Sequence, residues 1–388
     1  MTLSEKLYDL LAKQLPCDKG FVALHEPCFA GHEWDYVKEC LDTGWVSSVG
    51  KYVDQFENDL AEYTGVTKAV ACVNGTAALS VALRLVGVQQ GDEVLVPALT
   101  FIATTNAIAY QGAIPHFVDS EYQSLAVCVN KLESHLKDIT EMRDGFCFNK
   151  QSGRRIAALV VVHVFGHPAK DIEDLVSLCQ KYNIKLVEDA AESLGSFYKG
   201  KHTGHFGSVA ATSFNGNKIL TTGGGGALLT NDPELGKLAK HLTTTAKVPH
   251  AWRFNHDMLG YNYRLPNINA ALGVAQLEQL PKFLEQKKRL FEAYKQLFAG
   301  CDEFELLGPV DGAESNHWLN AIILKPEFTN EFELILNEVN QKGFMLRPLW
   351  TLMHHMPMYS DCPRMDLSVA QDLEKRTINI PSSAFLGG

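Results

Sequence analysis

The chain has 388 residues, of which 46% are hydrophobic and 21% charged, and its formal net charge is −10 at pH 7. These proportions indicate an ordinary globular protein; the acidic balance excludes a broad basic surface for nucleic acid, and no apolar run of about 18 residues suggests a membrane span. Its nine cysteines show no C-x-x-C pair and no metal-ligand spacing, which favours reduced thiols, a cytoplasmic location and no metal site.

Residues 1–20 are predicted to form a helical lead. The run MTLSEKLYDLLAKQL is amphipathic and carries acidic residues, so it lacks the apolar core of a signal peptide. After it, the stretch from Pro27 to Gly65 predicts two helices, with the loop GWVSSVG at 44–50 between them.

From residue 69 to about residue 235 strands and helices alternate along the chain. The predicted strands are 69–73, 93–96, 114–118, 156–163, 184–188, 208–214 and 226–230, and the predicted helices are 76–87, 102–112, 129–138 and 169–182. This alternation argues for an α/β fold with a mostly parallel sheet covered by helices on both faces. The polar stretch 139–155 interrupts it and is interpreted as an irregular surface excursion.

The C-terminal part begins with a long amphipathic helix predicted at 267–298. Strands are predicted near 318–325 and 344–348, which makes the last segment α+β. No Pro/Ser-rich linker or repeat separates the parts, so we expect two domains packed together. We place the N-terminal lead and the large domain in 1–250, and the long helix with the small domain in 251–388.

Lys218 is the most informative residue of the chain. It lies in the run SFNGNKILTTGGGG, 29 residues after the acidic pair Glu188-Asp189. A lysine amine can form a Schiff base with an aldehyde cofactor when its surroundings hold it partly deprotonated. A lone lysine beside a glycine turn is usually a surface residue, so the interpretation depends on the motifs around it.

The glycines at 223–226 do not form a nucleotide phosphate loop. The motif G-x-x-x-x-G-K-[ST] places the lysine after the glycines, whereas Lys218 precedes them. We expect these glycines to let the backbone turn tightly so that Lys218 faces a pocket.

Three upstream motifs place polar groups that can bind a ligand at the ends of predicted strands. Gly75-Thr76 opens a predicted helix, where free N–H groups and a hydroxyl suit a phosphate, although a plain capped helix is the simpler reading. His163 ends an apolar strand, and such a histidine is usually structural. Asp189 ends another buried strand, where open α/β sheets place ligand contacts.

Six motifs occur together and in a fixed order along the chain: NGTAAL, PALTFIATTNAI, HVFGHP, VEDAAESLGS, SFNGNKILTTGGGG and GYNYRLPNINAALGVAQL. In this the chain resembles the DegT/DnrJ/StrS family of pyridoxal-phosphate-dependent nucleotide-sugar aminotransferases, from about Val22 to Ser383. The resemblance implies the aspartate-aminotransferase-like fold of fold type I enzymes.

The resemblance also assigns roles to particular residues. It implies that Lys218 forms the Schiff base with pyridoxal 5′-phosphate and that Asp189 pairs with the ring nitrogen. It implies that Phe101 stacks on the ring, and that Gly75, Thr76 and Ser213 hold the phosphate.

Two further positions follow from the same resemblance. Asn262 of GYNYR would reach the cofactor of the neighbouring subunit, which implies a homodimer with shared active sites. Glu192 would contact the phenolic oxygen of the cofactor, although many members of the family carry Gln or His at this position.

The implied activity is transfer of an amino group from glutamate to C4 of a nucleotide-linked keto sugar in surface-glycan biosynthesis. The segments beginning LHEPCFAG and RPLWTLMH resemble a subgroup that acts on 4-keto-6-deoxy-N-acetylhexosamines, of the bacillosamine and legionaminic-acid type, and UDP and GDP stay open. Related sugar dehydratases carry His at the position of Lys218, and a non-catalytic regulatory protein would not need the intact set of site residues.

The sugar pocket is the least determined part of the site. Trp45 and the cluster Asn316-His317-Trp318 lie outside the cofactor motifs. Aromatic rings with a few polar partners suit a sugar face or a nucleobase, so we predict that Trp45, Asn316 and His317 bind the substrate. The alternative is that both tryptophans are ordinary core residues.

Overall fold

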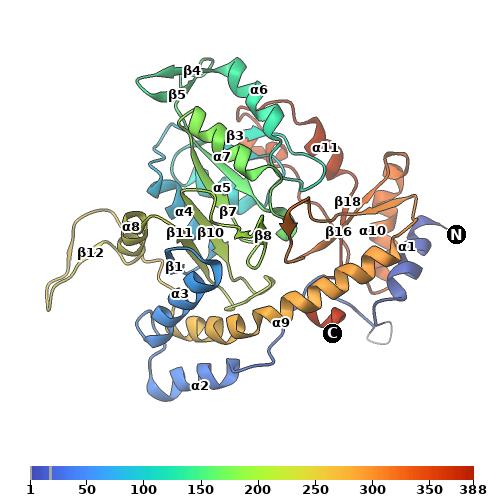
Figure 1. Ribbon diagram of the computed structural model, residues 1–388, viewed down its shortest axis with the longest axis horizontal. Helices are drawn as coiled ribbons and strands as arrows, with labels where there is room; N and C mark the ends of the chain where they lie inside the picture. The colour runs from blue at the N-terminus through green and yellow to red at the C-terminus, as the bar shows by residue number, and fades with distance from the viewer. Residues whose placement is uncertain (1, 17–19) are drawn as a thin grey trace.

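The computed structural model describes residues 2–16 and 20–388 and has an α/β architecture (Figure 1). The helices are α1 Leu3–Ala12, α2 Glu33–Thr43, α3 Lys51–Thr64, α4 Gly75–Leu85, α5 Ile102–Ala109, α6 Val129–Ile139, α7 Ile172–Lys181, α8 Pro233–Thr243, α9 Asn267–Leu297, α10 Phe332–Gln341 and α11 Ser368–Glu374. The strands are β1 Lys68–Cys72, β2 Glu93–Pro97, β3 Ile114–Val118, β4 Thr140–Arg143, β5 Phe146–Asn149, β6 Ile156–Val162, β7 Lys185–Asp189, β8 Phe197–Tyr198, β9 Lys201–His202, β10 Val209–Ser213, β11 Gly226–Thr230, β12 Lys247–Val248, β13 Asn255–His256, β14 Phe304–Leu306, β15 Ala313–Glu314, β16 Asn320–Leu324, β17 Arg347–Pro348 and β18 Thr377–Ile380.

Seven strands form the central sheet in the order β1-β11-β10-β7-β6-β2-β3. Strand β11 runs antiparallel to both of its neighbours, and the pairs from β10 to β3 are parallel. The predicted α/β fold with a mostly parallel sheet is therefore confirmed. Six strands consequently end at the same edge of the sheet, where α/β proteins bind ligands.

Alternate side chains of each central strand enter different cores. In β2, Val94 and Val96 pack beneath α4, α5 and α8, whereas Leu95 packs against α6 and α7. In β1, Val70 joins the first of these cores, and Ala69 packs with α3 and the first half of α9. This period of two, with apolar residues at both positions, is what a sheet buried on both faces requires.

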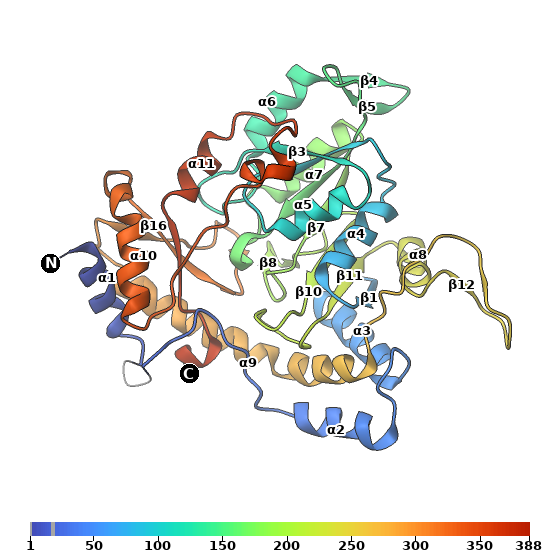
Figure 2. The ribbon, with the colours of Figure 1, turned by 180° about the vertical axis from the view of Figure 1, so that it is seen from behind.

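A second sheet of four strands, β14-β16-β18-β17, forms the C-terminal unit. Helix α9 runs beneath both sheets, as both views show (Figures 1 and 2), and its residues Leu290 and Tyr294 enter the C-terminal core. Leu7 and Leu11 of α1 pack into the same core, next to Ile335 of α10. The first helix thus contributes to the C-terminal unit, and the division into 1–250 and 251–388 stays a prediction.

Two segments differ from their predicted structure. The stretch 139–155 contains the β-hairpin β4–β5, whose turn residues Asp144 and Gly145 have φ values of 49° and 80°. Asp-Gly with two positive φ angles is a preferred hairpin turn, so the interpretation as an irregular excursion was wrong. The strand predicted at 344–348 shrinks to Arg347–Pro348, because Phe344 pairs with Val22 instead of the sheet.

The described part of the chain contains no candidate membrane-spanning helix, no metal-binding cluster and no disulfide. None of its helices is long and apolar enough to cross a membrane. No group of three or more His, Cys, Asp or Glu side chains within residues 2–16 and 20–388 could hold a metal ion. The eight cysteines in these ranges are all free thiols.

Candidate active site

A pocket of about 300 Å³ lies where the parallel strands end. It contains seven of the predicted site residues, namely Gly75, Thr76, Phe101, Asp189, Glu192, Ser213 and Lys218. They come from four separate connections of the central sheet, those after β1, β2, β7 and β10. The C-terminal unit adds Trp318 and Trp350 to the wall, so both parts of the chain build one pocket.

The N-terminus of α4 offers the pocket an anion site. The Asn74 side chain caps the helix by accepting a hydrogen bond from the Ala77 N–H group at 2.8 Å. The N–H groups of Gly75 and Thr76 have no hydrogen-bond partner among the residues that the structure describes. Free N–H groups at a helix start, with the helix dipole behind them, favour a phosphate.

Close packing holds this helix start against the strand end that carries Ser213. A Cβ atom on Gly75 would lie 2.8 Å from the Ser213 Cβ atom. A Cβ atom on Gly226, the first residue of β11, would lie 2.6 Å from the Gly75 nitrogen. Both positions require glycine, so the last residue of the glycine run places the helix start beside the Ser213 hydroxyl.

Asp189 presents a buried carboxylate at the end of β7. Its Oδ2 accepts a hydrogen bond from the Thr104 hydroxyl at 2.7 Å, and its Oδ1 accepts one from the Ala191 N–H group at 3.1 Å. Burial raises the pKa of Asp189, and the hydrogen bonds from Thr104 and Ala191 oppose that rise. A cationic partner in the pocket would therefore be bound strongly.

Lys218 faces the same pocket and is mostly buried, with 14% of its side chain exposed. Its Nζ atom lies 3.3 Å from Oε1 of Glu192 and 3.9 Å from the centroid of the Trp318 ring. The Trp318 Nε1–H group donates to the Asn217 carbonyl at 2.7 Å, which fixes the ring under the lysine. The amine is therefore held between a carboxylate and an aromatic face.

Glu192 is held from both sides. Its Oε2 accepts a hydrogen bond from the Phe165 N–H group at 2.9 Å, and Phe165 has a φ angle of 56°, which is rare for a residue other than glycine. Burial raises the pKa of Glu192, while Lys218 and the Phe165 N–H group act in the opposite direction. The strained turn thus serves to aim a backbone donor at this carboxylate.

Glu188, the neighbour of Asp189, points away from the pocket. It accepts hydrogen bonds from the N–H groups of Gly204, Phe206 and Gly207 and from the Nε2 atom of His163. Burial opposes its charge, but these donors outweigh it, so the pKa of Glu188 lies below its ordinary value. The contacts make Glu188 and His163 a structural pair, as the simpler interpretation of His163 expects.

Four predicted residues lie outside this pocket. Asn316 is buried, and its side chain bonds the carbonyls of Glu192 and Leu194 and the Trp318 N–H group. His317 is also buried and stacks on the Phe291 ring at 4.1 Å. Asn262 is exposed and accepts hydrogen bonds from the Arg264 guanidinium at 2.9 and 3.1 Å.

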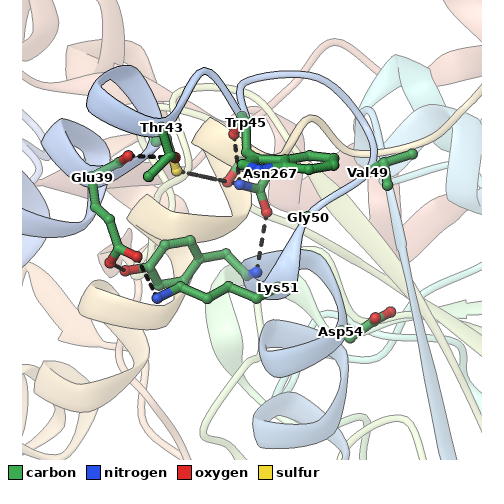
Figure 3. A pocket seen from close by; sticks show the side chains of 10 residues that line it. Glu39, Thr43, Trp45, Val49, Gly50, Lys51, Asp54 and Asn267 are labelled. Carbon is green, nitrogen blue, oxygen red and sulfur yellow. Dashed lines mark hydrogen bonds and ion pairs between the residues drawn. The ribbon is translucent and has the colours of Figure 1, made fainter.

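Trp45, the fourth of these residues, lines a second pocket of about 390 Å³ (Figure 3). Asn267, the first residue of α9, shapes it by donating to the Trp45 carbonyl at 2.7 Å and accepting from the Tyr52 N–H group at 3.1 Å. Trp45 is 58% exposed. The described lining residues of the two pockets do not overlap. The substrate roles of Trp45, Asn316 and His317, and the role of Asn262 at the cofactor of the neighbouring subunit, stay predictions.

Sequence reasoning missed Trp350 and Thr104, and it expected Trp318 only as part of a cluster with Asn316 and His317 on the sugar side of the cleft. The Trp318 ring contacts the Lys218 amine, and the Trp350 ring centroid lies 6.3 Å from that of Phe101. The Thr104 hydroxyl donates a hydrogen bond to Asp189. Thr104 belongs to the motif PALTFIATTNAI and follows Phe101 by three residues, so helical spacing was a usable signal. No local signal marks Trp350 or the contact between the Trp318 ring and Lys218.

Comparisons with known proteins find similar sequences and structures along most of the chain. The chain is 38% identical over 362 residues to GDP-perosamine synthase from Escherichia coli O157:H7, covering 93% of both chains. It is 33% identical to the UDP-4-amino-4,6-dideoxy-N-acetyl-β-L-altrosamine transaminase of Campylobacter jejuni, covering 80% of this chain and 77% of that one. The PLP-form structure of Spr1654 from Streptococcus pneumoniae superposes with a TM-score of 0.83 at 25% identity, covering 93% of both chains.

The shared fold is that of fold type I sugar aminotransferases, as the sequence predicts. The family profile matches residues 27–387 and so includes every element of the pocket. The chain belongs to the DegT/DnrJ/EryC1/StrS aminotransferase family.

Proposed function

We propose that this aminotransferase moves an amino group from glutamate to C4 of a nucleotide-linked 4-keto-6-deoxy sugar, UDP- or GDP-linked, in surface-glycan biosynthesis. The observation that carries the proposal is the pocket that joins Lys218, Asp189 and the open N-terminus of α4. Two relatives act on GDP- and UDP-linked amino sugars according to their names. An N-acetylhexosamine is the substrate that the subgroup resemblance favours.

Pyridoxal phosphate is the cofactor of this enzyme, and the residues present fit it. The unpartnered N–H groups of Gly75 and Thr76, with the hydroxyls of Thr76 and Ser213, suit the phosphate. The buried Asp189 carboxylate suits a protonated ring nitrogen. Phe101, half exposed at the pocket wall, offers a flat face for the ring. When bound, the cofactor supplies an aldehyde for the amine and an electron sink.

Lys218 is the general acid–base residue of this site. Its amine is the single basic side chain among the described lining residues of the pocket. As a free amine it accepts a proton from one carbon and delivers it to another, which is general acid–base catalysis by a positioned group. Glu192 and the Trp318 ring keep the amine in place while it does so.

Substitution of Trp45 tests the part of the proposal that concerns sugar binding. Substituting Trp45 by Ala should raise KM for the keto sugar by about 5- to 150-fold, because stacking of a base on an aromatic ring contributes about 1–3 kcal/mol. KM for glutamate should change little, because glutamate does not fill the nucleotide region. Steady-state kinetics with each substrate varied in turn measures both constants.

The control for Trp45 is Trp34→Ala, which removes a tryptophan that is 77% exposed on α2. It should leave both KM values unchanged. Equal damage to both half-reactions by Trp45→Ala, together with a lowered Tm, would mark Trp45 as structural.

A homodimer with shared active sites is part of the same proposal. The segment containing β12 and β13 projects from the body of the molecule (Figure 1). Trp252 and Phe254 on it are 77% and 78% exposed, and Asn262 lies at its base. Large apolar side chains on a projecting arm are typical of a surface that a partner subunit covers.

Mixing two inactive variants tests the shared site. Lys218→Ala and Asn262→Ala subunits should each lose activity alone, but their hybrid dimer contains one unmutated composite site. Random exchange should therefore restore about one quarter of the parent activity per site. Mixing Lys218→Ala with Asp189→Asn is the matched control, because both residues belong to the same pocket and no intact site can form. Recovery in neither mixture, with subunit exchange demonstrated by mass, would contradict a role of Asn262 across subunits.

One assay separates the candidate functions. The purified protein with pyridoxal phosphate, glutamate and a UDP- or GDP-linked 4-keto sugar should yield the amino sugar and 2-oxoglutarate, detected by mass spectrometry. Dehydration of the sugar without transfer would indicate a dehydratase. Binding without turnover would indicate the regulatory alternative.

A further inference from the structure

The pocket contains more buried acidic groups than basic ones. Among its described lining residues, Asp189 and Glu192 are acids and Lys218 is the single base. A buried ionised carboxylate is stable only with a charged partner or several donors. In the protein alone, Lys218 serves this purpose for Glu192, at 3.3 Å.

Lys218 cannot keep its positive charge during the reaction. An ammonium group has no lone pair, so the lysine must lose its proton before it can attack an aldehyde or accept a proton. Glu192 would then face a neutral amine and the added charge of a phosphate, while the ring nitrogen engages Asp189. The remaining hydrogen-bond donor to the Glu192 carboxylate is the Phe165 N–H group. Asn316 also contacts Glu192, but at its main-chain carbonyl and not at the carboxylate.

Histidines on the surrounding elements bring no compensating charge. Burial lowers the pKa of His167, after the Phe165 turn, to about 4. Burial, Lys287 and Lys218 hold the pKa of His25 well below its ordinary value. His163 is bonded to Glu188, on the other side of β7. A proton on Glu192 itself is the remaining way to remove its charge.

We propose that Glu192 takes the proton that Lys218 loses when the cofactor binds, and then works as a neutral carboxylic acid that returns this proton to Lys218. The inference rests on the proposed function of the site. One ammonium and one carboxylate become one amine and one carboxylic acid, so the charges balance and no proton leaves the pocket. Because Oε2 accepts the Phe165 N–H group, the proton belongs on Oε1, the oxygen that faces Lys218.

Infrared difference spectroscopy of the full chain, before and after addition of pyridoxal phosphate, tests the proposal. Visible absorbance reports cofactor uptake in the same sample. A carboxylic-acid C=O band, which shifts in D₂O, should appear with uptake. The Glu192→Gln variant has nearly the shape of the protonated acid, so it should bind the cofactor at least as tightly and lack this band.

The control is Glu33→Gln, which changes another buried glutamate, bonded to the Gln276 side chain and not among the residues that line the pocket. It should keep the band. Uptake of the cofactor without an acid band, a band that persists in Glu192→Gln, or loss of binding in that variant would each overturn the inference alone. Absence of cofactor uptake in the parent protein would overturn the proposed function as well.

Discussion

Substituting Lys218 by Ala should abolish amino transfer, with a loss of at least about 10²- to 10⁴-fold, the range for removal of a positioned acid–base group. The variant should still bind pyridoxal phosphate, because the phosphate and ring contacts come from Thr76, Ser213 and Asp189. Its visible spectrum should be that of the free aldehyde, since no amine is left to react with it. Turnover is measured by the mass-spectrometric assay, and binding by equilibrium dialysis.

Lys218→Arg makes the same test more selective. Arginine keeps a positive charge beside Glu192, but it stays protonated and cannot act as a nucleophile or base. It should therefore be as inactive as Lys218→Ala while keeping the ion pair. Lys237→Ala, at an exposed lysine on α8, is the control and should leave transfer unchanged. Near-normal transfer by either Lys218 variant would disprove the assignment of this residue.

The central sheet could be predicted from the sequence because its strands are apolar at both faces and are separated by helices with period 3.6. The reversal of β11 could not be predicted, since periodicity does not report strand direction. The β4–β5 hairpin was missed although Asp144-Gly145 is a strong turn signal. Its strands are short and partly exposed, so their apolar alternation is weak.

The residues of the site also divide into those that the sequence predicts and those that it does not. The cofactor-side residues were predictable from motifs that each stand at the end of a strand, as Asp189 and Ser213 do. The choice of Asp189 over Glu188 came from the family resemblance, because the alternation of side chains along β7 requires only that one of two consecutive residues faces the other way. The role of Trp318, rather than Asn316 or His317, depends on a turn in which His317 has a φ angle of 49°. Tertiary packing determines that turn, and no periodic pattern in the sequence predicts it.

Replacing Asp189 by Asn should weaken retention of pyridoxal phosphate and slow amino transfer by about 30- to 1000-fold, equivalent to about 2–4 kcal/mol for one preorganised electrostatic group. Asparagine keeps the shape and a carbonyl that can accept from the Ala191 N–H group. What it removes is the charge that would face a protonated ring nitrogen. The loss is measured as kcat and as the Kd for the cofactor.

The pH dependence of binding gives this prediction a second readout. Burial raises the pKa of Asp189 in the protein without cofactor, and a cationic partner lowers it. Affinity that depends on the ionised carboxylate is complete above the free-protein value and falls as the pH drops through it. The decline should therefore begin at a higher pH than for an exposed aspartate, and Asp189→Asn should remove this component.

A matched variant distinguishes this electrostatic role from a structural one. Asp119 is also buried, accepts from the Ala370 N–H group at 2.9 Å and lies outside the pocket. Asp119→Asn should lower the free energy of unfolding while leaving cofactor affinity and its pH dependence unchanged. If Asp189→Asn behaved in the same way, its carboxylate would be a structural group, and the ring nitrogen would need Glu192 as its partner. Glu192 could then not store the proton of Lys218, so the outcome at Asp189 also decides which carboxylate is free to be neutral.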